Sequence, residues 1–230
     1  LVFPFMATIQ AYRGSISFLH MCFSPTASFA AAAFLGTAGA ASLREAKDKR
    51  DLPFASIPFL FGAQQLTEGI VWLTFASQSV QSVATFAYLL FSHVLWPIFI
   101  PLAVWYMEPV RWRRIILVPF ILTGVVVGFY FLYYLFTDSV APAIVNNCIA
   151  YQGTYFYQTF VLSPYSVATC ASCLVSSRRF VNVFGVLTFL AAIVSYRFFQ
   201  ANFVSVWCFF SAVLSTLIFW YFRSQRGKIA

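Results

Sequence analysis

The sequence predicts an all-α protein, a polytopic integral membrane bundle of seven transmembrane helices with its N-terminus outside and its C-terminus in the cytoplasm. Of the 230 residues, 61% are hydrophobic and 9% are charged, whereas a soluble domain usually carries about 25% charged residues. So little charge cannot cover a surface that faces water. Long uncharged runs and a one-sided distribution of Lys and Arg indicate the same class.

The apolar runs predict where the helices lie, because a membrane span needs about 20 residues in a helix. The first run begins with Ser24 and Pro25, an N-cap residue followed by a proline in the first turn. Ser163 and Pro164 repeat this pair near the start of the fifth run. The seven predicted helices cover residues 24–42, 53–75, 83–107, 115–137, 158–176, 180–198 and 201–222.

The basic residues of the connectors predict the orientation, since cytoplasmic connectors of membrane proteins are enriched in Lys and Arg. If seven helices alternate, 12 of the 14 basic residues fall on one side, and Arg13 and Arg197 fall on the other. This distribution also explains the net charge of +8, so we expect no nucleic acid partner. The 12 residues are Arg44, Lys47, Lys49, Arg50, Arg111, Arg113, Arg114, Arg178, Arg179, Arg223, Arg226 and Lys228.

The outer side is predicted to carry a long connector, residues 138–157, which could cap the bundle. It contains Cys148, and Cys22 lies at the outer end of the first helix. These two could form a disulfide or remain two thiols, because the sequence does not give their distance. Cys170 and Cys173 have CxxC spacing without a second Cys or His pair, so we expect no metal and no cofactor.

One predicted span, FGAQQLTEGIVW, carries polar side chains at membrane depth. At about 100° per residue, Gln64, Gln65 and Glu68 fall on the same face of a helix. Phe61 and Trp72 lie within the same arc of about 100°. A charged side chain at the centre of the bilayer costs about 2.5–3.5 kcal/mol, so this polar stripe is expected to face the bundle interior.

His93, in the third predicted helix, is the other ionisable residue at depth. The helical rise places His93 about 15 Å and Glu68 about 10 Å below the outer edge of the bilayer. We therefore expect the two to pair, or to share a water-filled pocket with Gln64 and Gln65. Alternatively, the same groups could only hold helices together, since such hydrogen bonds contribute about 0.6 kcal/mol on average.

Several known functions of seven-helix proteins do not fit the sequence. A retinal protein needs a lysine in its last helix, but Lys47, Lys49 and Lys228 lie in a connector or the tail. A zinc hydrolase needs several histidines, and the chain has His20 and His93. We expect a carrier of a small polar solute or protons. The alternative is a receptor, sensor or accessory subunit with an oligomeric or membrane-complex partner, and a lipid-modifying enzyme is the least expected.

Four segments resemble one known family: MCFSPTASF from Met21, FGAQQLTEGIVW, SSRRF and VSVWCFFSAVLS. Small bacterial multi-pass membrane proteins of unknown function typically open with Met-Cys-Phe-Ser and carry Gln-Gln-x-x-Glu-Gly. The resemblance spans Met21 to Phe222, although Pro25 replaces an expected alanine. It implies a bacterial cytoplasmic (inner) membrane location and a usual start at Met21. Residues 1–20 would then be an N-terminal extension preceding a transmembrane domain of residues 21–230.

Overall fold

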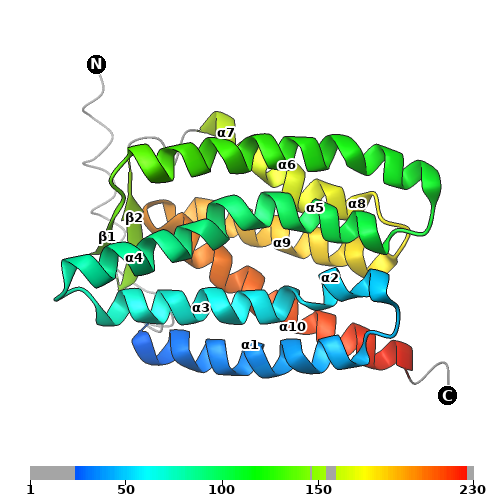
Figure 1. The fold of residues 1–230 in the computed structure, drawn as a ribbon, viewed down its shortest axis with the longest axis horizontal. Helices are drawn as coiled ribbons and strands as arrows, with labels where there is room; N and C mark the ends of the chain where they lie inside the picture. Colours follow the sequence, from blue (N-terminus) through cyan, green and yellow to red (C-terminus); the bar gives the residue numbers. More distant parts are fainter. Residues whose placement is uncertain (1–23, 146, 154–158, 227–230) are drawn as a thin grey trace.

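The computed structural model describes residues 24–145, 147–153 and 159–226, which form a bundle of helices with one β-hairpin at one end (Figure 1). The predicted all-α class is confirmed, and the hairpin is an addition to it. Helical segments occupy all seven predicted positions, with ends shifted by a few residues. In order they are α1 (Pro25–Glu45); α2 (Leu52–Ala55) with α3 (Ile57–Leu73); α4 (Gln78–Leu89) with α5 (Trp96–Met107); α6 (Arg111–Thr137); α7 (Thr159–Ser166) with α8 (Ser172–Leu174); α9 (Arg179–Phe198); and α10 (Phe203–Arg226).

Five helical stretches of the described residues are long and apolar enough to cross a membrane. A shorter apolar helix covers Val161–Leu174. The chain therefore fits a multi-pass membrane protein. The five stretches are Pro25–Glu45, Gln78–Met107, Arg111–Thr137, Arg179–Phe198 and Gln200–Gln225.

Two of these helical segments are interrupted by π-helical turns. The first π turn, Leu90–Leu95, joins α4 to α5, and the second, Val167–Ala171, joins α7 to α8. A π turn accommodates an extra residue within a helix and is frequently found at functional sites. Both turns carry buried polar side chains, so both bring polar groups into the interior.

The predicted start of the first helix is confirmed. The hydroxyl of Ser24 accepts a hydrogen bond from the backbone N–H of Ala27, and Pro25 occupies the first turn. Pro164, from the second such pair, lies inside α7 and not at its start. A proline inside a helix removes one backbone hydrogen bond.

Glycines allow the closest helix contacts. A methyl group on Gly39 of α1 would lie 2.3 Å from the backbone nitrogen of Phe59 on α3. A methyl group on Gly124 of α6 would lie 1.8 Å from the carbonyl oxygen of Pro97 on α5. No side chain larger than hydrogen fits at either distance, so these positions set the spacing of the two helix pairs.

The β-hairpin lies within the long connector of residues 138–157, where no strands were predicted. Strands β1 (Ala141–Val145) and β2 (Cys148–Gln152) pair antiparallel, with Val145 opposite Cys148. Asn147 in the turn has φ of 58°, a left-handed conformation that Asn tolerates better than most residues. The hairpin covers one end of the bundle, as predicted for the connector (Figure 1).

At the opposite end, polar contacts join the connectors. The carboxylate of Glu108 is buried and accepts hydrogen bonds from the backbone of Val110 and Ser177, at 3.1 and 2.7 Å. Arg178 forms an ion pair of 2.9 Å with Asp51, which precedes α2. These contacts hold the α5–α6 connector and the segment before α2 against the segment before α9.

Candidate functional site

The polar stripe of α3 faces the interior, as its helical spacing predicted. Gln64, Gln65 and Glu68 have no exposed surface. Ser205 of α10 donates a hydrogen bond to Glu68 Oε1, and Gln65 Nε2 donates one of 3.2 Å to Glu68 Oε2. Both carboxyl oxygens of Glu68 are thus engaged by side chains from two helices.

Trp96 forms a hydrogen bond with Gln64, the other glutamine of the stripe. Its indole Nε1 donates a 2.7 Å hydrogen bond to Gln64 Oε1. Its ring also stacks on Phe61, with the ring centroids 4.0 Å apart. Trp96 begins α5, so this contact joins α5 to α3 at the level of the stripe. Trp96 was not predicted to belong to the site, although a buried tryptophan in an apolar run needs an acceptor for its indole N–H.

Tyr88 of α4 adds a hydroxyl group to the same region. It lies beside Glu68 and Cys208, and its ring stacks on Tyr151 of β2 with centroids 4.7 Å apart. The hairpin thus reaches the candidate site through Tyr151. Tyr88 and Ser205 were also missed, because each is a common residue in an apolar run.

His93 lies in the first π turn and has partners different from those of Glu68. Its Nδ1 lies 2.8 Å from Ser92 Oγ, and its ring packs edge-on against Phe131 of α6. Tyr165 of α7 donates a hydrogen bond to the carbonyl oxygen of Ser92. The structure thus places His93 at the contact of the first π turn with α6 and α7, while Glu68 bonds to α3 and α10.

Trp72 lies apart from the hydrogen bonds of Glu68. It packs against a small buried cluster of Cys148 and Val206, near the hairpin. Its buried Nε1 has no hydrogen-bond partner among the described residues. The position of Trp72 on the inner face of α3 was predicted, and its contact with the hairpin was not.

Two polar atoms of the stripe are buried without a partner among the residues that the structure describes. These are Nε2 of Gln64, a donor, and Oε1 of Gln65, an acceptor. A buried polar group left unpaired costs about 1–3 kcal/mol. A donor and an acceptor of this kind, on neighbouring residues beside a carboxyl group, can bind a small polar molecule or water.

A small cavity lies next to the stripe. It has a volume of about 40 Å³, and its lining includes Trp96, Thr169, Cys208 and Ser211. Trp96 and Cys208 both contact Gln64, so the cavity lies close to the stripe. The cavity has room for a few water molecules and polar groups to hold them. It is too small for a solute of metabolite size in this conformation.

The cysteines do not form a recognisable site in the described part of the chain. Cys148 is buried in β2, and Cys22 lies outside the described residues, so their disulfide stays a prediction. The thiol of Cys173 donates to the carbonyl oxygen of Thr169 one turn earlier. Within residues 24–145, 147–153 and 159–226, no three His, Cys, Asp or Glu side chains come together as metal ligands would.

The chain matches a family model. A family model described as a family of unknown function (DUF6629) matches residues 21–230. No curated protein matches the chain, and no solved structure does either. The resemblance to an uncharacterised family is thereby confirmed.

Proposed function

Because the chain belongs to the family of unknown function DUF6629, we propose a function from its own geometry: it is a carrier in a bacterial cytoplasmic membrane. The carrier moves a small polar solute together with protons. Glu68 is the proton-binding group, and Gln64 and Gln65 provide the donor and the acceptor for the solute. Trp96 and Ser205 position these side chains.

The proposed carrier crosses the membrane seven times, with α2–α3 and α7–α8 as the two spans beside the five long ones. The distribution of basic residues supports this arrangement, with the C-terminus in the cytoplasm. Contacts at one end of the bundle support it too. Arg178 bonds to Asp51 and to Tyr221 near the end of α10, and Arg113 bonds to the carbonyl oxygen of Val175. The basic residues within 44–50, 111–114, 178–179 and 223–226 therefore lie near the same end.

The observation that carries the proposal is the polar environment of Glu68. Its carboxyl group has no exposed surface, yet donors from Ser205 and Gln65 reach both of its oxygens. A carboxyl group in a membrane interior is a functional candidate, as in proton relays. It can hold a proton while the site is closed and exchange it when the site opens to water. The small cavity lies where such an opening would begin.

The alternative function is a receptor, sensor or accessory subunit of a membrane complex. Its support is that the hydrogen bonds of the stripe join α3 to α5 and α10 with no space for a solute. In that case the stripe would serve packing alone. The two functions differ in one respect: a carrier must have a second conformation in which the stripe opens.

The test is electrical recording from proteoliposomes on a solid-supported membrane. Wild-type protein is exposed to amino acids, sugars, nucleosides and organic cations, with and without a pH gradient. We expect at least one class to give a transient current that depends on the gradient. We expect Glu68→Gln, which keeps the size and polarity of the side chain, to abolish that current. Ser215→Ala, a buried change that keeps clear of the stripe, should leave it unchanged.

Currents that are the same in wild type and Glu68→Gln would overturn the role of Glu68. Folded wild-type protein that responds to no class would favour the subunit. If Glu68→Gln does not fold, the wild-type current still tests proton coupling. The current of a carrier that is not coupled to protons would not depend on the pH gradient.

A further inference from the structure

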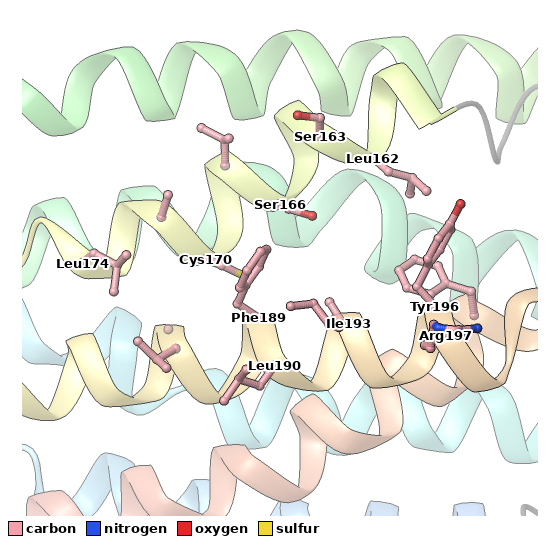
Figure 2. A pocket seen from close by; sticks show the side chains of 16 residues that line it. Leu162, Ser163, Ser166, Cys170, Leu174, Phe189, Leu190, Ile193, Tyr196 and Arg197 are labelled. Atoms are coloured by element: carbon pink, nitrogen blue, oxygen red, sulfur yellow. The ribbon is translucent and has the colours of Figure 1, made fainter.

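A large groove lies outside the candidate site, between α7–α8 and α9. Its volume is about 650 Å³, and its walls are almost entirely apolar (Figure 2). Leu174 lies toward one end of the groove, and Tyr196 and Arg197 lie at the other. The groove is open to the outside, and several of its apolar residues, among them Val186, Leu190 and Ile193, are exposed.

The groove narrows where α8 and α9 touch, and Gly185 accounts for this contact. A methyl group on Gly185 would lie 2.5 Å from the Cβ of Cys173 and 2.9 Å from the carbonyl oxygen of Cys170. The two helical segments therefore meet closely at Gly185. Beyond it, the second π turn and α7 run away from α9, and the space between them widens toward Arg197 (Figure 2).

The part of the groove between Gly185 and Arg197 is about as long as one leaflet of a bilayer is thick. From Gly185 to Arg197 the helix rises about 18 Å, at 1.5 Å per residue. The hydrocarbon core of a bilayer is about 30 Å thick, so one leaflet contributes about 15 Å. An acyl chain that lies along the groove would therefore place its head group at the level of Arg197.

The polar end of the groove has a positive charge. Arg197 is exposed in the last turn of α9, and among the described residues no carboxylate forms an ion pair with its guanidinium group. Tyr196 beside it is of the kind that gathers at membrane–water interfaces. Arginine binds phosphate through several N–H donors in a planar arrangement. An acyl chain of any lipid can fill an apolar groove in a membrane. This groove also places the guanidinium group of Arg197 where the head group of such a lipid would lie.

We propose that this groove, hereafter the α7–α9 groove, binds one acidic phospholipid, with an acyl chain between α7–α8 and α9 and the head-group phosphate on Arg197. The lipid belongs to the leaflet opposite the basic connectors. This binding is independent of the transport chemistry at Glu68, so either proposal can fail without the other.

Native mass spectrometry of the delipidated protein in detergent tests the proposal. The protein is titrated with phosphatidylglycerol, and separately with phosphatidylcholine of the same acyl chains. We expect one phosphatidylglycerol to be retained with at least tenfold preference. Arg197→Gln should weaken this binding about tenfold, the factor that the loss of one charge-assisted hydrogen bond corresponds to. Ser166→Phe, which places a ring in the groove, should weaken the binding of both lipids.

The matched control is Arg179→Gln, which removes an exposed arginine from the other end of α9. It should leave the binding of phosphatidylglycerol unchanged. Equal retention of the two lipids by wild type would overturn the proposal, as would equal weakening by Arg197→Gln and Arg179→Gln. Thermal unfolding of each variant shows whether it is folded. If Arg197→Gln is not, the lipid preference of the wild type and the effect of Ser166→Phe still decide.

Discussion

The hydroxyl group of Ser205 donates a hydrogen bond to Oε1 of Glu68, across 137 positions of the chain. Ser205 lies in the first turn of α10 and Glu68 in the second half of α3, and both side chains are fully buried. Removing one partner of such a bond leaves the other buried and unsatisfied. The candidate site therefore depends on how two distant helices pack.

Ser205→Ala should destabilise the protein by about 1–3 kcal/mol, because the buried Glu68 carboxyl group loses a donor. The measurement is the free energy of unfolding by SDS titration in mixed micelles. Ser215→Ala is the matched control, since its hydroxyl is equally buried on α10 but bonds to the backbone of Ala212 in the same helix. Equal losses for the two variants would show that the bond to Glu68 contributes nothing of its own.

Trp96→Phe should cost about 1–3 kcal/mol through the loss of the indole N–H that Gln64 Oε1 accepts. The aromatic contact with Phe61 would largely remain, so the change isolates the hydrogen bond. The same unfolding titration measures it, and Trp112→Phe on the exposed face of α6 should change stability by less than about 0.5 kcal/mol. A Trp96→Phe variant as stable as Trp112→Phe would contradict the prediction.

Gly124→Ala should destabilise the protein by about 1–3 kcal/mol or more, since the added methyl group would lie 1.8 Å from a backbone carbonyl oxygen of α5. That oxygen belongs to the main chain and cannot rotate away. Gly36→Ala on α1 is the control, because a methyl group there meets nothing within 4 Å. The control should be neutral or more stable, by up to about 1 kcal/mol. Thermal unfolding in detergent separates the two outcomes.

Asp51 should make stability depend on pH. Burial raises the pKa of Asp51 above its ordinary value, although the nearby Arg178 guanidinium opposes this effect. A carboxyl group with a raised pKa binds a proton more readily in the folded than in the unfolded protein, so its contribution to stability grows as pH falls. Wild type should therefore gain stability relative to Asp51→Asn between neutral pH and about pH 4. The prediction is contradicted if the thermal midpoint of wild type minus that of Asp51→Asn stays constant or decreases toward pH 4.

Reporter fusions test the proposed topology. A phosphatase reporter, active only outside the cytoplasm, should be active when fused at Ser77 and inactive when fused at Asp48 or after Arg226. A fluorescent reporter that folds only in the cytoplasm should give the opposite pattern. An active phosphatase at the C-terminus would contradict the orientation, and equal activity at Ser77 and Asp48 would contradict a span between them.

The positions of the helical segments could be predicted from the sequence because apolar runs and basic connectors are local signals. The inner face of α3 could be predicted for the same reason, since Gln64, Gln65 and Glu68 lie within two turns of one helix. The partners Trp96, Ser205 and Tyr88 could not. Each lies on another helix, and the packing of distant helices depends on side-chain shapes that one sequence does not reveal.

Two local features were also missed, for different reasons. The hairpin had a readable signal, because an Asn-Asn pair separates the segments APAIV and CIAYQ, and Asn favours tight turns. The π turns had no readable signal in the sequence, since LFSHVL and VATCA are as compatible with an ordinary α-helix as with a π turn. Depth estimates based on a regular helix therefore could not give the partners of His93.

The first π turn also limits how the chain can change in length. A π turn accommodates an extra residue within a helix, so loss of one residue within Leu90–Leu95 that restored a regular helix would leave α5 in about its present rotation relative to α4. An insertion into the segment has no such compensation and would rotate α5 by about 100°, the turn of an α-helix per residue. Trp96 would then point away from Gln64, so the contact between α5 and α3 tolerates the loss of one residue in this segment better than the gain of one.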